Sequence, residues 1–171
     1  TEGILKGMEQ VFQEPDRDKI RFIADRTISA LKAALENLSE GRIFFSFDQI
    51  RGICGNRNDN SFKGSEETFF VYINKNNGEK AAIINFACHP TILNASNRRI
   101  SADFPGAIDR FLERKGYRFS MFLNGSSGDI STRYTRKDSS YEEVERMGNI
   151  IGQKVLENFE SATETDIEEF Y

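Results

Sequence analysis

Two strand-like runs joined by a tight turn constrain the fold of this chain more than any other feature of its sequence. The run ETFFVYIN (67–74) is followed by Asn76-Asn77-Gly78, and a second run spans residues 80–87. Asn and Gly tolerate the positive φ angles of tight hairpin turns, so the two runs are predicted to form an antiparallel hairpin. The second run contains AAIINFA, which is apolar on both faces and therefore predicts a strand inside a sheet.

Helical and strand-like periodicities alternate around this hairpin. Apolar residues with helical spacing predict helices over residues 18–38, 105–115 and 141–159. Pro105 near a first turn and Gly116 beyond the last fit the middle helix, while Ser139 or Ser140 is expected to cap the third. Short Phe-rich or apolar runs predict further strands at 42–50 and 117–123. The expected fold class is α/β, with a mixed sheet and flanking helices.

The length of 171 residues suits a single domain or a fragment of a larger one. The first residue is Thr1 rather than Met, so we expect a chain cut from something longer. Residues 4–12 predict a short helix or a loose end, and residues 161–171 predict an acidic tail or linker.

Charge and hydropathy exclude several classes of partner. Lys and Arg number 23 against 27 Asp and Glu, a net charge of -4, without the basic excess that nucleic-acid binding needs. No run reaches the roughly 18 apolar residues of a transmembrane helix, and the N-terminal residues lack the layout of a signal peptide. We therefore expect no nucleic acid as partner and no transmembrane segment, while the compartment stays open.

Cysteine and histidine counts limit the metal and redox chemistry. The chain has two cysteines, Cys54 and Cys88, and a single histidine, His89. These cannot build a disulfide framework or a four-ligand zinc cluster by themselves. The cysteines are expected to be buried apolar thiols rather than redox groups.

Two predicted strands end in segments that are suited to chemistry. CHPTILN follows Ala87 and NGSSGDIS follows Leu123, and ligands of α/β proteins commonly bind at such strand ends. His89 is either a metal ligand or a structural histidine. The Gly/Ser run offers serine hydroxyls and accessible backbone amides, although it is neither a nucleophile elbow nor a P-loop, and a plain solvent-exposed loop is the alternative.

Two further residues are candidates on their own. Arg57, in GNRNDN, carries a planar guanidinium suited to a carboxylate, a phosphate or a polarised carbonyl, unless it is an ordinary surface arginine. Asp103, in ISADFPG, could cap the helix that follows it and do nothing more.

Taken in order, GNRNDN, NFACHPTILN with ISADFPG, and FLNGSSGDIS resemble motifs of the neutral, non-lysosomal ceramidases, a family of zinc-dependent amidases. The resemblance implies that His89 is a zinc ligand, Ser131 the active-site serine and Arg57 a group that orients the substrate. Asp103, Gly128 and Asp129 would support them.

The resemblance also implies a larger catalytic domain, of which this chain is the central part. The remaining zinc ligands, including a second His, would come from the rest of that domain, so the fragment alone should be inactive. The substrate would be a lipid-like N-acyl amide, cleaved to fatty acid and sphingoid base, and the location secreted or periplasmic. Whether Ser131 is the nucleophile or stabilises the oxyanion stays open.

Two other functions are consistent with the same residues. Asn58 stands where the family commonly has Ser, and Pro90 where it has Gly, which fits a metal-dependent hydrolase of another acyl or ester substrate. The absence of a second His from this sequence fits a non-catalytic binding domain.

Overall fold

The computed structural model describes residues 16–59, 61 and 66–165, and its contacts divide the chain into two compact units, residues 1–39 and 40–171. In the first unit, helix α1 (Arg17–Glu36) begins after Asp16, whose side chain accepts hydrogen bonds from the Asp18 and Lys19 amides. This confirms the first predicted helix, yet none of its residues is buried. None of the helices described is long and apolar enough to cross a membrane.

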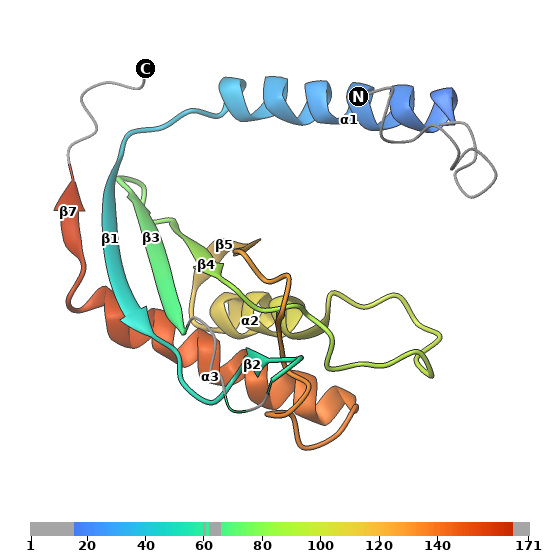
Figure 1. Cartoon of the computed structure of the whole chain (residues 1–171). Coiled ribbons are helices and arrows are strands. Elements are labelled where there is room, and N and C mark those ends of the chain that lie inside the picture. The colour runs from blue at the N-terminus through green and yellow to red at the C-terminus, as the bar shows by residue number, and fades with distance from the viewer. Residues whose placement is uncertain (1–15, 60, 62–65, 166–171) are drawn as a thin grey trace, which may run out of the picture. The chain divides into compact units, whose positions relative to one another are not determined.

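Within the described residues, the second unit contains a five-stranded sheet with helices on one face (Figure 1). Its strands are β1 (Gly41–Gln49), β3 (Glu67–Lys75), β4 (Lys80–Phe86), β5 (Tyr117–Asn124) and β7 (Thr163–Thr165). They lie in the order β5-β4-β3-β1-β7, with β4 and β5 parallel and the other neighbours antiparallel. The fold is therefore α/β with a mixed sheet, as predicted.

The predicted hairpin is present between β3 and β4. Gly78 adopts φ +91°, a conformation that glycine reaches without strain, and its amide donates a hydrogen bond of 2.9 Å to the Lys75 carbonyl. β4 lies between β3 and β5, inside the sheet, as its two apolar faces predicted.

Helices α2 (Asp103–Arg114) and α3 (Tyr141–Phe159) cover one face of the sheet and form the core with it (Figure 1). Ser140 caps α3 by accepting a hydrogen bond from the Glu143 amide, and Gly116 ends α2 with φ +87°. The Tyr72 hydroxyl donates a hydrogen bond of 2.9 Å to the Val155 carbonyl, which joins the sheet to α3. Burial raises the pKa of Tyr72 to about 12, so this hydroxyl keeps its proton.

The structure describes only part of the segments that were predicted as ends of the chain. Part of the predicted acidic tail is an edge strand, because Thr163–Thr165 pairs with residues 43–45 of β1. The remainder of that tail, from residue 166, and the segment 4–12 lie outside the described residues.

A second, two-stranded sheet consists of β2 (Gly55–Asn56) and β6 (Ile130–Ser131). Neither the GNRNDN segment nor the Gly/Ser run was predicted to contain a strand. Each is only two residues long, too short for any periodic pattern to reveal it.

Candidate functional site

Three segments that are distant in sequence meet at Ser131. Gly55 of β2 pairs with Ser131 in antiparallel fashion, and His89 forms a parallel bridge with the same residue. The His89 amide donates a hydrogen bond of 3.0 Å to the Ile130 carbonyl. The structure thus unites the Arg57 segment, the His89 segment and the Gly-Asp-Ile-Ser turn in what we call the Ser131 junction, residues 55–57, 88–89 and 129–131.

The junction lies at the carboxyl ends of two parallel strands. β4 leads into His89, and β5 leads into the Gly/Ser run, with α2 between them in the chain. Asn124, the last residue of β5, accepts a hydrogen bond from the Cys88 amide at 3.2 Å and donates one of 3.0 Å to Ser127 Oγ. This is the edge at which sequence analysis predicted a site.

Asn56 and Asp129 fix the position of Arg57. The Arg57 amide donates a hydrogen bond of 2.7 Å to the Asp129 carbonyl, and Asn56 Nδ2 donates one of 2.7 Å to Asp129 Oδ2. The Arg133 guanidinium donates to the Arg57 carbonyl at 3.1 Å. Sequence analysis missed Asn56 and Arg133, although Asn56 stands directly before the arginine that it did select.

Ser131 and its neighbours differ in exposure. Ser131 is buried, and its Oγ accepts a hydrogen bond of 3.3 Å from the Arg133 amide, whereas Gly128 and Asp129 are exposed. A Cβ at Gly128 would meet nothing within 4 Å, but one at Gly125 would come within 3.1 Å of the Ala87 Cβ. Close approach of the backbone therefore requires glycine at position 125 rather than at the selected position 128.

Asp103 holds the loop that follows His89. It is buried and adopts φ +55°, a left-handed conformation that is unusual for a residue with a side chain. Its Oδ2 accepts a hydrogen bond from the Leu93 amide at 2.9 Å, and its Oδ1 one from the Phe104 amide at 2.8 Å. The predicted cap role is wrong, because Ala102 is the N-cap residue of α2 and Asp103 is the first residue of the helix. Asp103 instead fastens the loop to the start of α2.

The described residues do not by themselves fit a zinc ion. They contain no group of three or more His, Cys, Asp or Glu side chains placed to hold a metal. His89 contributes one imidazole, and zinc sites in proteins have three or four ligands. Both cysteines are buried. The hydrogen bond with Cys54, together with burial, raises the pKa of the Cys88 thiol. Cys88 therefore stays protonated and does not act as a thiolate ligand or nucleophile.

A groove of about 880 Å³ lies at one end of the sheet, where β1, β4 and β5 end and β3 begins. Its apolar lining residues are Phe47, Phe69 and Ala87, and Gly125 and Ser126 of the Gly/Ser run also line it. Asp48, Gln49 and Arg51 form part of its polar rim.

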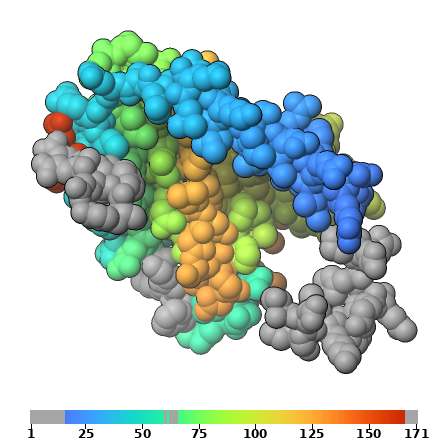
Figure 2. Space-filling view, turned by 90° about the horizontal axis from the view of Figure 1, so that it is seen from above, coloured from blue at the N-terminus to red at the C-terminus, as the bar shows by residue number. Residues whose placement is uncertain are grey.

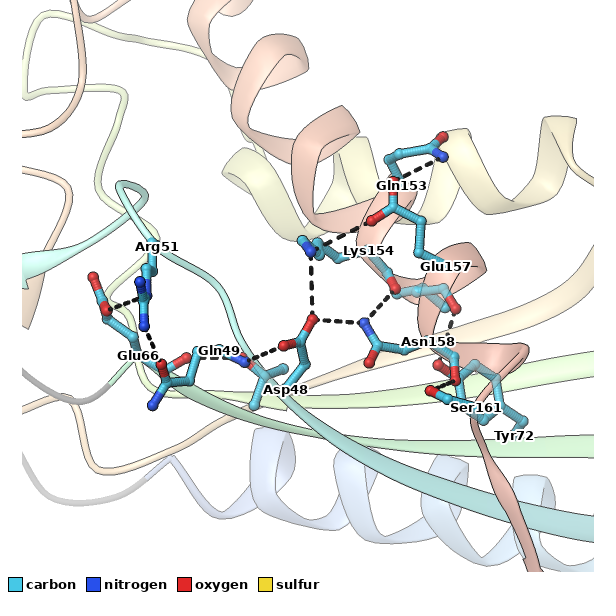
Figure 3. A network of polar contacts seen from close by, with 12 residues as sticks. Asp48, Gln49, Arg51, Glu66, Tyr72, Gln153, Lys154, Glu157, Asn158 and Ser161 are labelled. Atoms are coloured by element: carbon cyan, nitrogen blue, oxygen red, sulfur yellow. Dashed lines mark hydrogen bonds and ion pairs between the residues drawn. The ribbon is translucent and has the colours of Figure 1, made fainter.

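A network of polar contacts links this rim to α3 (Figure 3). Asp48 Oδ2 accepts a hydrogen bond of 2.9 Å from Asn158 Nδ2 and forms an ion pair of 3.4 Å with Lys154. Arg51 donates to Gln49 Oε1 at 2.9 Å and pairs with Glu66 at 3.7 Å. The end of β1 is thus anchored to the helical layer.

Comparison with known proteins gave matches only at the level of structure. No model of a protein family matches the chain, and no curated protein matches it. The structure of a ceramidase complexed with C2 is similar, with a TM-score of 0.64 and 21% identity over 74% of this chain. The neutral ceramidase of Pseudomonas aeruginosa has a TM-score of 0.66 and 21% identity over 79%.

The chain has the fold of one part of a neutral ceramidase. It covers 23% of the first ceramidase and 25% of the second, so it spans about a quarter of their length. The ceramidase resemblance predicted from the motifs is therefore confirmed for the fold, whereas the roles predicted for individual residues stay predictions.

Proposed function

We propose that this chain is part of a zinc-dependent amide hydrolase that cleaves the N-acyl bond of ceramide-like lipids into a fatty acid and a sphingoid base. The observation that carries this proposal is the Ser131 junction. It assembles Arg57, His89 and Ser131 at the carboxyl ends of parallel strands, in a chain with the fold of part of a ceramidase.

The chemistry of the junction residues suits amide hydrolysis. Arg57 would donate hydrogen bonds to the carbonyl or hydroxyl groups of the lipid and so orient the amide. The Ser131 hydroxyl would attack the amide carbon or donate to the oxyanion that forms on the carbonyl oxygen. Asp129, held by Asn56, would keep the turn in place, and Gly128 would leave it open to the substrate.

His89 would be one ligand of the zinc ion. The other ligands must come from residues beyond those described, which contain no complete metal-binding group. The chain by itself is therefore expected to bind zinc weakly and to release no fatty acid, because affinity depends on several convergent ligands.

A related hydrolase activity is the second candidate. Asn58, which is exposed beside Arg57, and Pro90, directly after His89, occupy positions that touch the same junction. The Asn58 and Pro90 side chains would give the substrate different contacts from the Ser and Gly that the ceramidases commonly have at these positions. This difference favours hydrolysis of another acyl or ester bond on the same scaffold.

The test uses the neutral ceramidase of Pseudomonas aeruginosa with its matching segment replaced by this full chain. We expect the chimera to bind zinc and to release fatty acid from an N-acylsphingosine, with loss of release after chelation and in the His89→Ala and Ser131→Ala variants. Release from a panel of other acyl amides and esters, with none from the N-acylsphingosine, would favour the second candidate. A folded, zinc-loaded chimera that hydrolyses none of these substrates would overturn both.

A further inference from the structure

Helix α1 of the first unit carries large apolar side chains that are not buried. It has 20 residues, and none of them is buried in the part of the chain that the structure describes. Six of its apolar side chains are each more than half exposed: Ile20, Phe22, Ile23, Ile28, Leu31 and Leu35. Figure 2 shows α1 in blue, in view along its length. Most helical stability in proteins comes from packing of an apolar face, so α1 requires a surface to pack on.

Five of these six side chains share one face of the helix, which we call the α1 apolar face. An α-helix has about 3.6 residues per turn, and the five therefore fall within an arc of about 140°: Ile20, Ile23, Ile28, Leu31 and Leu35. The sixth, Phe22, lies on the opposite side of the helix. There the Arg26 guanidinium lies over its ring, 5.1 Å from the centroid.

The charged residues of α1 are ordered around the helix. Arg21 and Lys32 border the apolar face along one side, and Lys19 and Arg26 border it along the other. The acidic residues lie between these two basic borders, on the side away from the apolar face: Asp18, Asp25 and Glu36. Five basic residues stand against three acidic ones, so α1 is net positive although the whole chain has a net charge of -4.

We propose that α1 binds the surface of an anionic lipid membrane. The helix lies in the plane of the interface, with its apolar face at the acyl chains and its basic borders at the lipid phosphates. Large apolar side chains on one face with Lys or Arg beside them suit this position, because long basic side chains reach the headgroups while their stems stay on apolar groups. The acidic residues face water, away from the phosphates.

The charges of α1 argue against a second copy of this chain as the occupant. When two helices pack through their apolar faces, the residues that border each face meet across the contact. Both borders of α1 are basic, so like charges would meet in a parallel pair and in an antiparallel pair alike. A membrane surface that contains anionic lipids offers phosphates to both borders at once.

Membrane binding by α1 goes beyond the proposed function and does not depend on it, because it uses no residue of the Ser131 junction. For a hydrolase of ceramide-like lipids, α1 would hold the protein at the surface in which its substrate lies. Only this consequence rests on the proposed function. The binding itself is measured without zinc and without substrate, so the two proposals fail separately.

Binding of the full chain to lipid vesicles tests the proposal. We expect the chain to sediment with vesicles of phosphatidylcholine and phosphatidylglycerol in a ratio of about 2:1, and much less with phosphatidylcholine alone. Salt should weaken the binding, because it screens the basic borders from the phosphates. The helical signal in far-UV circular dichroism should rise on binding, because the membrane stabilises α1.

Leu31→Asp and Phe22→Asp form a matched pair of variants. Both side chains are 59% exposed, and they lie on opposite faces of α1. Each variant adds the same negative charge, whereas only Leu31→Asp places it in the apolar face. We expect Leu31→Asp to bind the anionic vesicles about tenfold or more weakly than Phe22→Asp. Arg21→Gln with Lys32→Gln should weaken this binding by about tenfold or more and change binding to phosphatidylcholine little.

One further variant controls for the second unit. Phe119→Asp replaces an exposed apolar side chain of β5 and should bind vesicles as the wild type does. Thermal unfolding should be the same for the wild type and the α1 variants, because no residue of α1 is buried in the described chain. A loss of binding in Leu31→Asp therefore reports on the α1 apolar face rather than on misfolding.

Three outcomes would overturn the proposal. The first is a folded chain that does not bind the anionic vesicles. The second is equal binding by Leu31→Asp and Phe22→Asp, or loss of binding in Phe119→Asp. The third is a dimer in sedimentation velocity that Leu31→Asp dissociates and the anionic vesicles do not, which would assign the α1 apolar face to a second copy.

Discussion

Asn56 and Asp129 join the two segments on either side of the Ser131 junction, through a hydrogen bond of 2.7 Å between Asn56 Nδ2 and Asp129 Oδ2 that spans 73 residues of sequence. Asn56 also accepts hydrogen bonds from the Asn58 and Asp59 amides, at 2.9 and 3.1 Å. One side chain therefore fixes both the Arg57 loop and the turn that carries Ser131.

Truncation of Asn56 is expected to loosen the junction. Asn56→Ala removes a hydrogen bond to a carboxylate and the acceptor for two amides, and should lower the free energy of unfolding by about 2 kcal/mol. Urea unfolding of the isolated chain measures this loss. Asn58→Ala is the matched control, because Asn58 contributes its backbone amide rather than its side chain to this contact and should change stability little. Equal losses in both variants would contradict the anchoring role of Asn56.

The contact between α2 and α3 depends on glycine at position 148. A Cβ there would lie 2.4 Å from the Ala107 Cβ and 3.0 Å from the Phe104 carbonyl oxygen, and neither atom can move without displacing the α2 backbone. We expect Gly148→Ala to destabilise the chain by about 1–3 kcal/mol, in spite of the higher helix propensity of alanine. Thermal unfolding measures the change.

Gly152→Ala serves as the comparison in the same helix. Its Cβ would lie 2.4 Å from the ring of Phe111, a partly exposed side chain that can rotate away. The loss should therefore be smaller than for Gly148→Ala. A larger loss at position 152 would show that the ring, rather than the α2 backbone, limits the approach of the helices.

The stability of the chain should depend on pH through Asp48. The hydrogen bond from Asn158 lowers the pKa of Asp48 below its ordinary value of 3.8, with help from the Gln49 amide and the charge of Lys154. A carboxyl group with a lowered pKa in the folded state contributes stability above its unfolded pKa, and this contribution is lost as the pH falls through the folded pKa. The contribution is thus present at pH 7 and disappears in the acid range below about pH 4.

Urea unfolding at pH 7 and near pH 3 tests this expectation. Asp48→Asn should be less stable than the wild type by about 1 kcal/mol at pH 7, a value reduced by solvent screening, and the two proteins should converge in acid. Asp25→Asn, on the exposed helix α1, should run parallel to the wild type at both pH values. If the difference in free energy of unfolding between Asp48→Asn and the wild type were the same at both pH values, the charge of Asp48 would contribute nothing to stability.

Sequence predicted the larger elements because their side chains repeat with a clear period. The hairpin of β3 and β4 and the helix α3 combine such a period with a turn or cap at the expected residue, Gly78 and Ser140. The strands β2, β6 and β7 escaped prediction because two or three residues carry no period, and they exist only through pairing with distant parts of the chain.

In the candidate site, too, some residues could be predicted from the sequence and others could not. Motifs selected His89, Arg57 and Ser131, and the structure brings their segments together. The residues that hold them, Asn56 and Arg133, carry no motif of their own, since their importance arises only once β2 and β6 are paired.

The left-handed backbone of Asp103 provides the last prediction. Asp103→Ala would remove the acceptors for the Leu93 and Phe104 amides and would place a Cβ at φ +55° without the polar side chain that makes this conformation tolerable. We expect a loss of about 2–4 kcal/mol in the free energy of unfolding.

Two further variants at this position separate the causes. Asp103→Gly loses the same two hydrogen bonds but relieves the backbone, so it should lie between the wild type and Asp103→Ala. Asp103→Asn keeps one carbonyl acceptor and tolerates the left-handed conformation, so it should be the least destabilised. If Asp103→Gly were as unstable as Asp103→Ala, the hydrogen bonds alone would account for the loss. The position would then need a carboxylate to hold the loop after His89, rather than relief of a strained backbone.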